Sequence, residues 1–430
     1  MMRVLDKMLE GITVPRMFKV KQNFNAAKVD DLVQALHKEL NKREILGKIH
    51  PGKRIAIGIG SRGLCKIDLL ARELVKFIKE RGAKPFIIPA MGSHGGATAE
   101  GQAEILASLG ITEAAVGCPI VSSMDVVQIG NISNGLPVYM DKHAVQEADG
   151  IVFIARIKPH TAFRNKSESG FAKMIAIGFG KHRGAATCHS YGYRHMGEHI
   201  LQIAEVALKN APILFAVGTV ENAYDEIMHV TAVPAERLLE EDQRLLPIAM
   251  ENIPRILFDK IDVLIVDKIG KEISGEGMDP NVIGRYASPY VASANYPTRI
   301  GVLDLTEKSH GNATGIGTAD YITRRIFNKI DFEATYANCI TAVLPGAAKI
   351  PIVMNSDYDL FRAAILTAEV PDLKKVRLVR IADTLHLKTI MISENMIDEA
   401  YKNPNLTILT DPLELKFDAK GNLLDLNGSL

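Results

Sequence analysis

Short apolar runs alternate with amphipathic helical segments along much of this chain, and this rhythm constrains the fold more than any other feature. The apolar runs occupy residues 54–58, 85–89, 150–155, 212–217 and 262–266. Apolar residues at helical spacing predict helices between these runs, near residues 69–82, 98–109, 196–209 and 234–257. Buried strands that alternate with helices predict an α/β fold with a mainly parallel sheet.

A second unit with the same rhythm is expected toward the C-terminus. Strands are predicted at residues 299–305 and 376–382, and helices at residues 318–329 and 358–368. A chain of 430 residues is also long enough for more than one hydrophobic core. We therefore predict two α/β domains, residues 1–268 and 269–430, with an active-site cleft between them. The polar tail, residues 415–430, is expected to be loosely held.

Composition excludes several classes of protein. The 51 basic and 50 acidic residues give a net charge of +1, which predicts neither a nucleic-acid partner nor an anionic membrane partner. The four cysteines are widely spaced without a CxxC pair, as is typical of reduced cytosolic thiols rather than disulfides or structural zinc. The first residues lack the apolar core of a signal peptide, and no apolar stretch is long enough to span a bilayer. We expect a cytoplasmic protein.

Chemically versatile side chains follow three of the predicted strands. Ser61 and Arg62 follow the first strand, His94 follows the second, and His160 follows the strand at 150–155. Ligands of open α/β sheets bind beyond the carboxyl ends of the strands, so we expect these loops to form one site. Histidine titrates near neutral pH and suits acid–base work, although a loop histidine taken alone is more often solvated than catalytic.

The loop around Arg62 and the segment that ends at Lys173 each allow two interpretations. Gly58–Gly63 reads G-x-G-x-x-G after a strand, but the next strand lacks the acidic residue that a dinucleotide site requires. A tight turn is the commoner explanation, and it leaves Arg62 to hold a carboxylate or phosphate. Lys173 lies among small and apolar residues, where burial would lower its pKa and make it nucleophilic. The alternative is an exposed lysine at a strand edge.

Other candidates favour ordinary structural roles. Cys188 precedes His189, but we interpret this cysteine as a small buried hydrophobe rather than a reactive thiol. His195 and His199 have the i, i+4 spacing of a helical metal pair. No glutamate lies between them in the H-E-x-x-H manner, so a surface pair is the better interpretation.

The ordered combination of these segments resembles a known family. A Gly-x-His loop, a Pro-His segment, a Ser-Gly-x-Ala-Lys segment and a downstream histidine are similar to the nickel-dependent lactate racemase family of 2-hydroxyacid racemases and epimerases. Here the gaps are 66 residues from His94 to His160, 13 from His160 to Lys173 and 16 from Lys173 to His189. The resemblance covers roughly residues 10–290.

This resemblance implies a cofactor and residue roles. The family uses a nickel pincer nucleotide, a pyridinium ring with two sulfur arms that hold nickel. By resemblance, Lys173 anchors the cofactor as a thioamide and His189 ligates the nickel. His94 and His160 correspond to the paired acid–base histidines. Ser61 and Arg62 lie in the cofactor-binding first loop, where Arg62 is expected to touch the substrate carboxylate or the cofactor.

The implied chemistry explains these residue types. Direct deprotonation of a 2-hydroxyacid at its α-carbon is difficult beside a carboxylate. Transfer of hydride to the pyridinium and back avoids a carbanion and gives a keto acid that can present either face. A proton leaves the hydroxyl on one side and returns on the other, which calls for two bases. The implied partners are a small 2-hydroxyacid and the cofactor-synthesis proteins, and a homo-oligomer is compatible with the sequence.

The chain departs from the family pattern in ways that concern the substrate. The first loop keeps Arg62 but lacks the family's aspartate and proline, and the chain contains no tryptophan. Phe171 stands where the family has glycine and is expected to add bulk near the cofactor. The family's substrate-binding lysine has no clear counterpart, so Arg285, Lys308 or His310 are candidate substitutes. We expect a larger or more polar 2-hydroxyacid than lactate.

Two other functions remain open from the sequence. A zinc- or iron-dependent hydrolase or lyase would use His94, His160 and His189 as ligands, although no carboxylate lies at matched spacing. A non-catalytic or regulatory homologue would bind a hydroxyacid or nucleotide without turnover.

Overall fold

The computed structural model describes residues 4–61, 64–292 and 297–426. The chain divides into two compact units: a central unit, Asn25–Ile253, and a composite unit, which combines Met1–Phe24 with Pro254–Leu430. The sequence predicts a boundary at 268/269 instead. The difference arises because the strands at Met17–Gln22 and Val263–Ile269 both join the sheet of the composite unit.

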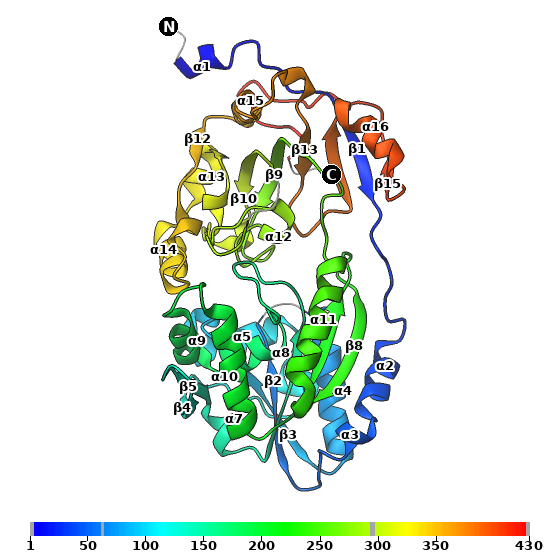
Figure 1. Ribbon diagram of the computed structural model, residues 1–430, viewed down its shortest axis with the longest axis vertical. Coiled ribbons are helices and arrows are strands. Elements are labelled where there is room, and N and C mark those ends of the chain that lie inside the picture. Colours follow the sequence, from blue (N-terminus) through cyan, green and yellow to red (C-terminus); the bar gives the residue numbers. More distant parts are fainter. Residues whose placement is uncertain (1–3, 62–63, 293–296, 427–430) are drawn as a thin grey trace. The chain divides into compact units, whose positions relative to one another are not determined.

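The central unit contains most of the elements that the apolar rhythm predicts (Figure 1). Its strands are β2 (Arg54–Ile59), β3 (Lys84–Pro89), β4 (Val126–Asn131), β5 (Pro137–Asp141), β6 (Gly150–Arg156), β7 (Ile213–Glu221) and β8 (Ile227–Pro234). Its longer helices are α2 (Leu32–Leu40), α4 (Ile67–Glu80), α5 (Ala99–Ser108), α9 (Lys181–His189), α10 (Met196–Asn210) and α11 (Leu238–Asn252). Shorter turns of helix are α3 (Arg43–Leu46), η1 (Gly95–Ala97), α6 (Glu113–Val116), α7 (Lys142–Gln146), α8 (Phe171–Lys173), η2 (Met174–Gly178) and η3 (Ala235–Arg237).

The five-stranded sheet of the central unit has the order β3-β2-β6-β7-β8. The first four strands are parallel and β8 is antiparallel to β7. Both faces are covered, which explains why the strands are continuous apolar runs. Ile55 and Ile57 belong to the same cluster as the buried residues of α2 and α4. Phe153 packs on the opposite face, edge-on to Phe171 and Phe179.

The composite unit is built on an eight-stranded sheet. Its strands are β1 (Met17–Gln22), β9 (Val263–Ile269), β10 (Arg299–Leu305), β11 (Tyr321–Thr323), β12 (Ile352–Met354), β13 (Leu378–Ile381), β14 (Thr389–Ser393) and β15 (Leu406–Ile408). Its helices are α1 (Val4–Met8), α12 (Pro280–Ile283), α13 (Arg324–Lys329), α14 (Phe332–Thr341), α15 (Asp357–Leu366) and α16 (Ile397–Lys402). Single turns of 3-10 helix are η4 (Glu307–Ser309), η5 (Ile316–Thr318), η6 (Pro345–Ala348), η7 (Leu373–Lys375) and η8 (Glu394–Met396).

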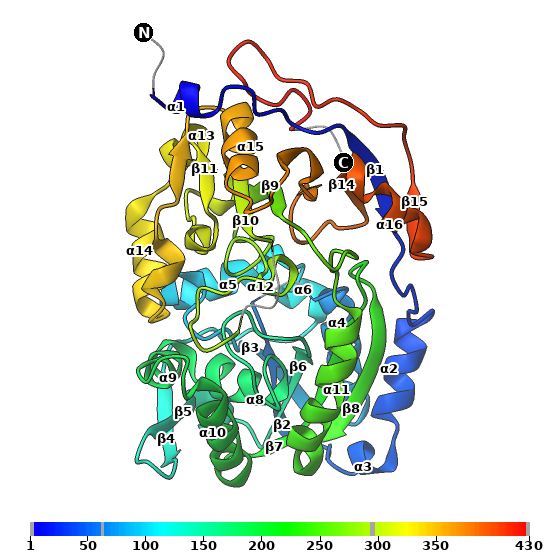
Figure 2. The ribbon, with the colours of Figure 1, turned by 45° about the horizontal axis from the view of Figure 1, so that its top comes forward.

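The order of this sheet is β12-β11-β10-β9-β13-β14-β1-β15. The strands from β12 to β13 are parallel, and those from β14 to β15 pair antiparallel. Figure 2 shows β1, from the start of the chain, beside β14 and β15 from its end. The predicted α/β class with mainly parallel sheets is therefore confirmed.

Two details of the prediction are wrong. The helix expected at 318–329 is divided into the short strand β11 and the helix α13. The described part of the tail is held rather than loose, because Leu423 is buried and its backbone N–H donates to Asp357 Oδ2 at 2.8 Å. Among the described residues, no helix has both the length and the apolar character needed to cross a membrane.

Candidate active site

A pocket of about 190 Å³ lies at the carboxyl ends of β2, β3 and β6 in the central unit. These three strands are neighbours in the sheet, so the loops that follow them converge, as the sequence predicts. The pocket is lined by Gly60, Ser61, Leu64, Ile67, Ala90, Met91, His94, Ile154, Ala155, Arg156, Lys158, Ser169, Gly170, Lys173, Met174, Ile177 and Gly178. It therefore brings together Ser61, His94 and Lys173, while His160 and His189 lie outside the lining. Arg62 lies outside the described residues.

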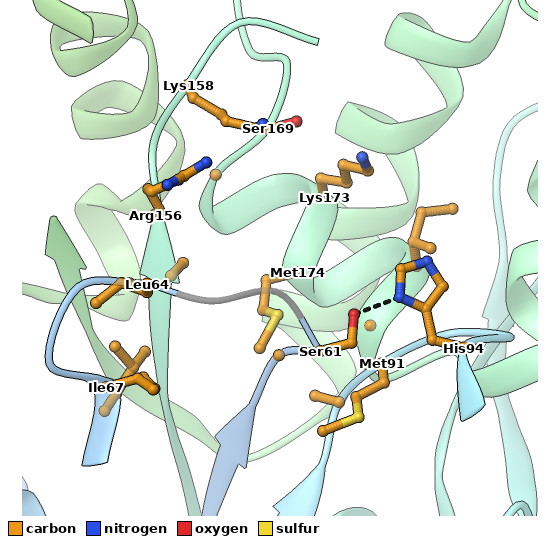
Figure 3. Close-up of a pocket in the computed structure, with 17 residues that line it drawn as sticks. Ser61, Leu64, Ile67, Met91, His94, Arg156, Lys158, Ser169, Lys173 and Met174 are labelled. Carbon is orange, nitrogen blue, oxygen red and sulfur yellow. Dashed lines mark hydrogen bonds between the residues drawn. The ribbon is translucent and has the colours of Figure 1, made fainter. Parts of the chain in front are cut away.

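Ser61 and His94 form a hydrogen-bonded pair at the edge of the pocket. The Ser61 hydroxyl contacts His94 Nδ1 (Figure 3), and the hydroxyl either donates or accepts according to the tautomer of the ring. When Nδ1–H donates to Ser61, Nε2 of His94 carries a lone pair and can accept a proton. The imidazole is exposed, so it remains accessible to a ligand.

His160 lies in a loop that a buried carboxylate organises. Glu168 is buried and accepts the backbone N–H of His160 at 2.6 Å and the Arg164 guanidinium at 3.1 Å. The His160 ring stacks on Phe163 with centroids 4.3 Å apart, and its Nδ1 accepts the backbone N–H of Ala162 at 3.0 Å. A neutral ring with Nδ1 as acceptor carries its proton on Nε2. His160 in this arrangement therefore presents an N–H donor.

The helical turn that carries Lys173 is anchored by the buried side chain of Asp242, which the sequence analysis did not identify. Asp242 Oδ1 accepts the backbone N–H of Phe171 at 3.0 Å, and Oδ2 accepts that of Ala172 at 3.2 Å and the hydroxyl of Ser167. A carboxylate at a helix N-terminus satisfies amides that would otherwise lack partners. Burial nevertheless raises the pKa of Asp242 above its usual value. Asp242 thereby holds the start of the turn that places Lys173 in the pocket.

Gly170 permits this anchoring. A Cβ at residue 170 would overlap Asp242 Oδ1, so a side chain at this position would displace the carboxylate. The chain then continues from α8 into a π-helical turn, η2, a feature that is often found at functional sites. In the view of Figure 3, Lys173 and His94 project to one side of Met174 and Arg156 to the other.

His189 is partly buried at the end of α9, and its imidazole has a lowered pKa. Burial, with a smaller contribution from the Lys173 ammonium, lowers the pKa of His189 to about 4. Its Nδ1 atom is buried and has no hydrogen-bond partner in the described part of the chain. The ring of Tyr193 is near both His189 and His160. Its centroid is 5.7 Å from that of His189 and 6.2 Å from that of His160. A neutral imidazole with an unsatisfied buried nitrogen is suited to ligate a metal.

Two further cationic residues line the pocket, and neither is among the site residues predicted from the sequence. Arg156 ends β6 and forms an ion pair with the buried Glu221, which also accepts the backbone N–H of Cys65 at 2.8 Å. Lys158 follows two residues later and lines the same wall. The signal was available, because both residues follow a predicted strand at its carboxyl end. The Arg156 charge is balanced by Glu221, so Lys158 and Lys173 are the lining residues that make this pocket suitable for an anionic ligand.

Two expectations about nearby residues have clear outcomes. Phe171 does not add bulk to the pocket, because its ring is fully buried in the core and fills the space beside Gly218. That expectation was wrong, since the side chain points to the sheet rather than to the loops. Cys188 is fully buried, and burial raises its pKa to about 12, as the structural interpretation predicts. All four cysteines are free.

The three candidate substrate residues all belong to the composite unit. Arg285 forms an ion pair with Asp320 at 2.7 Å, and its guanidinium also donates to three backbone carbonyl oxygens. These contacts engage both Nη atoms within its own unit. Lys308 and His310 are exposed, and His310 has a left-handed backbone with φ of 47°.

The comparison with known protein families agrees with the motifs. Residues 7–200 match the lactate racemase N-terminal domain family. The matched residues include the pocket-forming loops after β2, β3 and β6. No curated protein matches the sequence. Among solved structures, the chain is similar to the lactate racemase apoprotein from Thermoanaerobacterium thermosaccharolyticum, with 15% identity and a TM-score of 0.43 over 85% of this chain and 88% of that one. The family match supports a racemase-type enzyme. Residues 7–200 therefore form a lactate racemase N-terminal domain.

Proposed function

We propose that this protein is a racemase or epimerase of a 2-hydroxyacid that uses a nickel pincer nucleotide. The observation that carries the proposal is the convergence of Ser61, His94 and Lys173 on one pocket at the ends of adjacent parallel strands. The nearby His189 supports the same chemistry. These residues hold the ordered positions that the family assigns to its acid–base, anchoring and metal-ligating side chains.

The residues present fit the implied cofactor. His189 offers a neutral imidazole whose buried Nδ1 has no hydrogen-bond partner among the described residues. Lys173 lines the pocket, and its positive charge helps to lower the pKa of His189. Lys173 would therefore anchor the cofactor and His189 would ligate its nickel. When bound, the cofactor would supply a hydride acceptor and donor for C2 of the substrate.

His94 and His160 are proposed to remove and return the proton of the substrate's 2-hydroxyl group. His94 presents a lone pair on Nε2 when its Nδ1–H donates to Ser61, so it is suited to remove the proton from one enantiomer. His160, with its Nδ1 accepting from Ala162, presents Nε2–H and is suited to return a proton on the other face. The two rings have complementary protonation states when His94 adopts its Nδ1–H tautomer. The reverse direction requires the roles to exchange.

The substrate is proposed to be a 2-hydroxyacid other than lactate that is larger or more polar. Glu221 balances the charge of Arg156, but the ammonium groups of Lys158 and Lys173 favour an anionic substrate or cofactor phosphate. Arg62 is proposed to contact the substrate carboxylate or the cofactor. The proposed partners are the substrate, the proteins that synthesise the cofactor and a second copy of the chain.

A hydrolase or lyase that uses a simple divalent metal is less well supported. Such sites need three or more protein ligands, and the described residues contain no group of three His, Cys, Asp or Glu side chains placed to hold one ion. A single protein imidazole with sulfur ligands from a cofactor does not need such a group.

The activity test uses protein produced together with the cofactor-synthesis enzymes. Single enantiomers of hydroxyacids of increasing size and polarity are incubated with it, and the opposite configuration is measured by chiral chromatography. We expect turnover of at least one acid, which His94→Ala and His160→Ala each abolish. Full activity in either variant would refute the paired acid–base roles. Activity restored by zinc or iron alone would favour the hydrolase or lyase instead.

A further inference from the structure

A fully buried ion pair lies behind the loop that carries His94. Lys181 Nζ is 3.2 Å from Asp141 Oδ2, and neither side chain is exposed to solvent. Transfer of both charges from water into the interior is costly, and their mutual attraction often only balances that cost. Stability alone therefore does not account for this pair, and its remaining contacts indicate what it holds in place.

Lys181 adopts an unusual backbone conformation to reach this position. Its φ is 53°, in the left-handed region that is unfavourable for a residue with a Cβ. From there, the ammonium donates to the carbonyl oxygen of Pro89, the last residue of β3, and to Gln102 Oε1 at 3.4 Å. The lysine thus connects the end of β3 to helix α5.

Gln102 transmits this constraint to the loop. Its side chain is fully buried, and its Oε1 faces the Lys181 ammonium, so its amide NH₂ must point the other way. Nε2 donates to the carbonyl oxygen of Gly92 at 2.9 Å and to that of His94 at 3.2 Å. A continuous series of buried polar contacts therefore runs from Asp141 through Lys181 and Gln102 to the backbone of His94.

We infer that Lys181 and Gln102 are positioning residues that fix the direction of the His94 imidazole. This inference rests on the acid–base role proposed for His94. The charge on Lys181 selects one orientation of the Gln102 amide, and the amide then holds two carbonyl oxygens of a loop that contains three glycines. Gly92 itself has φ of 59°, a conformation that glycine adopts readily, and the backbone N–H of His94 donates to the Met91 carbonyl oxygen at 3.1 Å, so the Gln102 amide adds to the loop's own hydrogen bonds.

Two variants of Gln102 separate positioning from folding. Gln102→Met keeps the size of the side chain but removes both donors. Gln102→Glu keeps the contact with Lys181 and places a carboxylate oxygen against the two carbonyl oxygens. Gln146→Met is the control, because Gln146 is an exposed glutamine on α7 of the same unit.

The primary readout does not depend on activity. The ring of His94 is observed by NMR in protein with labelled histidine, and its signal is assigned by its loss in His94→Gln. We expect both Gln102 variants to shift or broaden the His94 ring signals, while Gln146→Met leaves them unchanged. Unchanged His94 signals in the two folded Gln102 variants would overturn the inference. Loss of folding in both, with Gln146→Met folded, would overturn it too, because the network would then be structural only.

A second readout uses the cofactor-loaded enzyme. Displacement of a catalytic group by about 1 Å costs roughly 100-fold in rate, so kcat of Gln102→Met should fall by roughly 10- to 100-fold with little change in KM. An unchanged kcat would contradict the inference. If the wild-type protein racemises none of the acids tested, the proposed function fails, and the NMR result still decides whether Gln102 positions His94.

Discussion

The contact between Gly170 and Asp242 predicts that Gly170→Ala destabilises the protein. Replacement of glycine by alanine usually stabilises a protein where the backbone conformation allows it. The new Cβ would overlap Asp242 Oδ1 and force the carboxylate away from the N–H groups of Phe171 and Ala172, which it now accepts at 3.0 and 3.2 Å. Each hydrogen bond to a charged group contributes about 1.5–3 kcal/mol. The loss of one or both therefore costs about 1.5–6 kcal/mol. The opposing gain, from reduced freedom of the unfolded chain, is only about 0.4–1 kcal/mol.

Gly47→Ala provides the matched control. Gly47 has φ of −67°, and a Cβ there would meet only the carbonyl oxygen of Arg43, at 3.5 Å. In a unit of more than 200 residues, 1 kcal/mol corresponds to about 2–4 °C in melting temperature. Scanning calorimetry should therefore show Gly170→Ala melting at least about 3 °C below Gly47→Ala. Equal melting temperatures would refute the anchoring role of Asp242.

Three further predictions follow from protonation states. Burial raises the pKa of Asp242, so the Asp242 carboxyl binds a proton more readily in the folded protein than in the unfolded chain. The contribution of Asp242 to the free energy of unfolding therefore falls as pH rises from about 4 through the folded pKa. Urea unfolding should accordingly show wild type losing stability relative to Asp242→Asn over that range; a relative gain would contradict it. NMR titration should find His189 neutral from pH 8 to 5, since its pKa is about 4. Lys173→Met should raise the pKa of His189, because the Lys173 charge lowers it. Protonation of wild-type His189 near pH 6.5 would contradict the lowered pKa. Nitrogen-15 shifts should place the proton of neutral His160 on Nε2, whereas a proton on Nδ1 would exclude the Ala162 contact.

The ends of β2 and β3 could be predicted from the sequence because each of these strands is a continuous apolar run followed by a glycine-containing loop. That pattern placed Ser61 and His94 at one edge of the sheet. The short strand β11 could not be found in the same way, because three residues are too few to show a strand period within a helical pattern. The strand β8 pairs at the edge of its sheet, directly before α11, and was also missed.

The residues that support the site were harder to predict than those that line it. Asp242 and Gln102 lie on helices, where polar side chains usually face solvent, and only the fold shows that both are buried. Their partners are backbone groups 70 or 71 residues away for Asp242 and 8 or 10 residues away for Gln102. Sequence spacing does not reveal such contacts, because they depend on how α11 and α5 pack against the loops.

The most direct test of the account is the mass and nickel content of the protein made together with the cofactor-synthesis enzymes. We expect wild-type protein to carry nickel and a covalent adduct that peptide mapping locates on Lys173. Lys173→Ala should lack the adduct, and a variant at an exposed lysine, Lys209→Ala, should retain it. Wild-type protein with neither adduct nor nickel, or an adduct that persists in Lys173→Ala, would contradict the central claim.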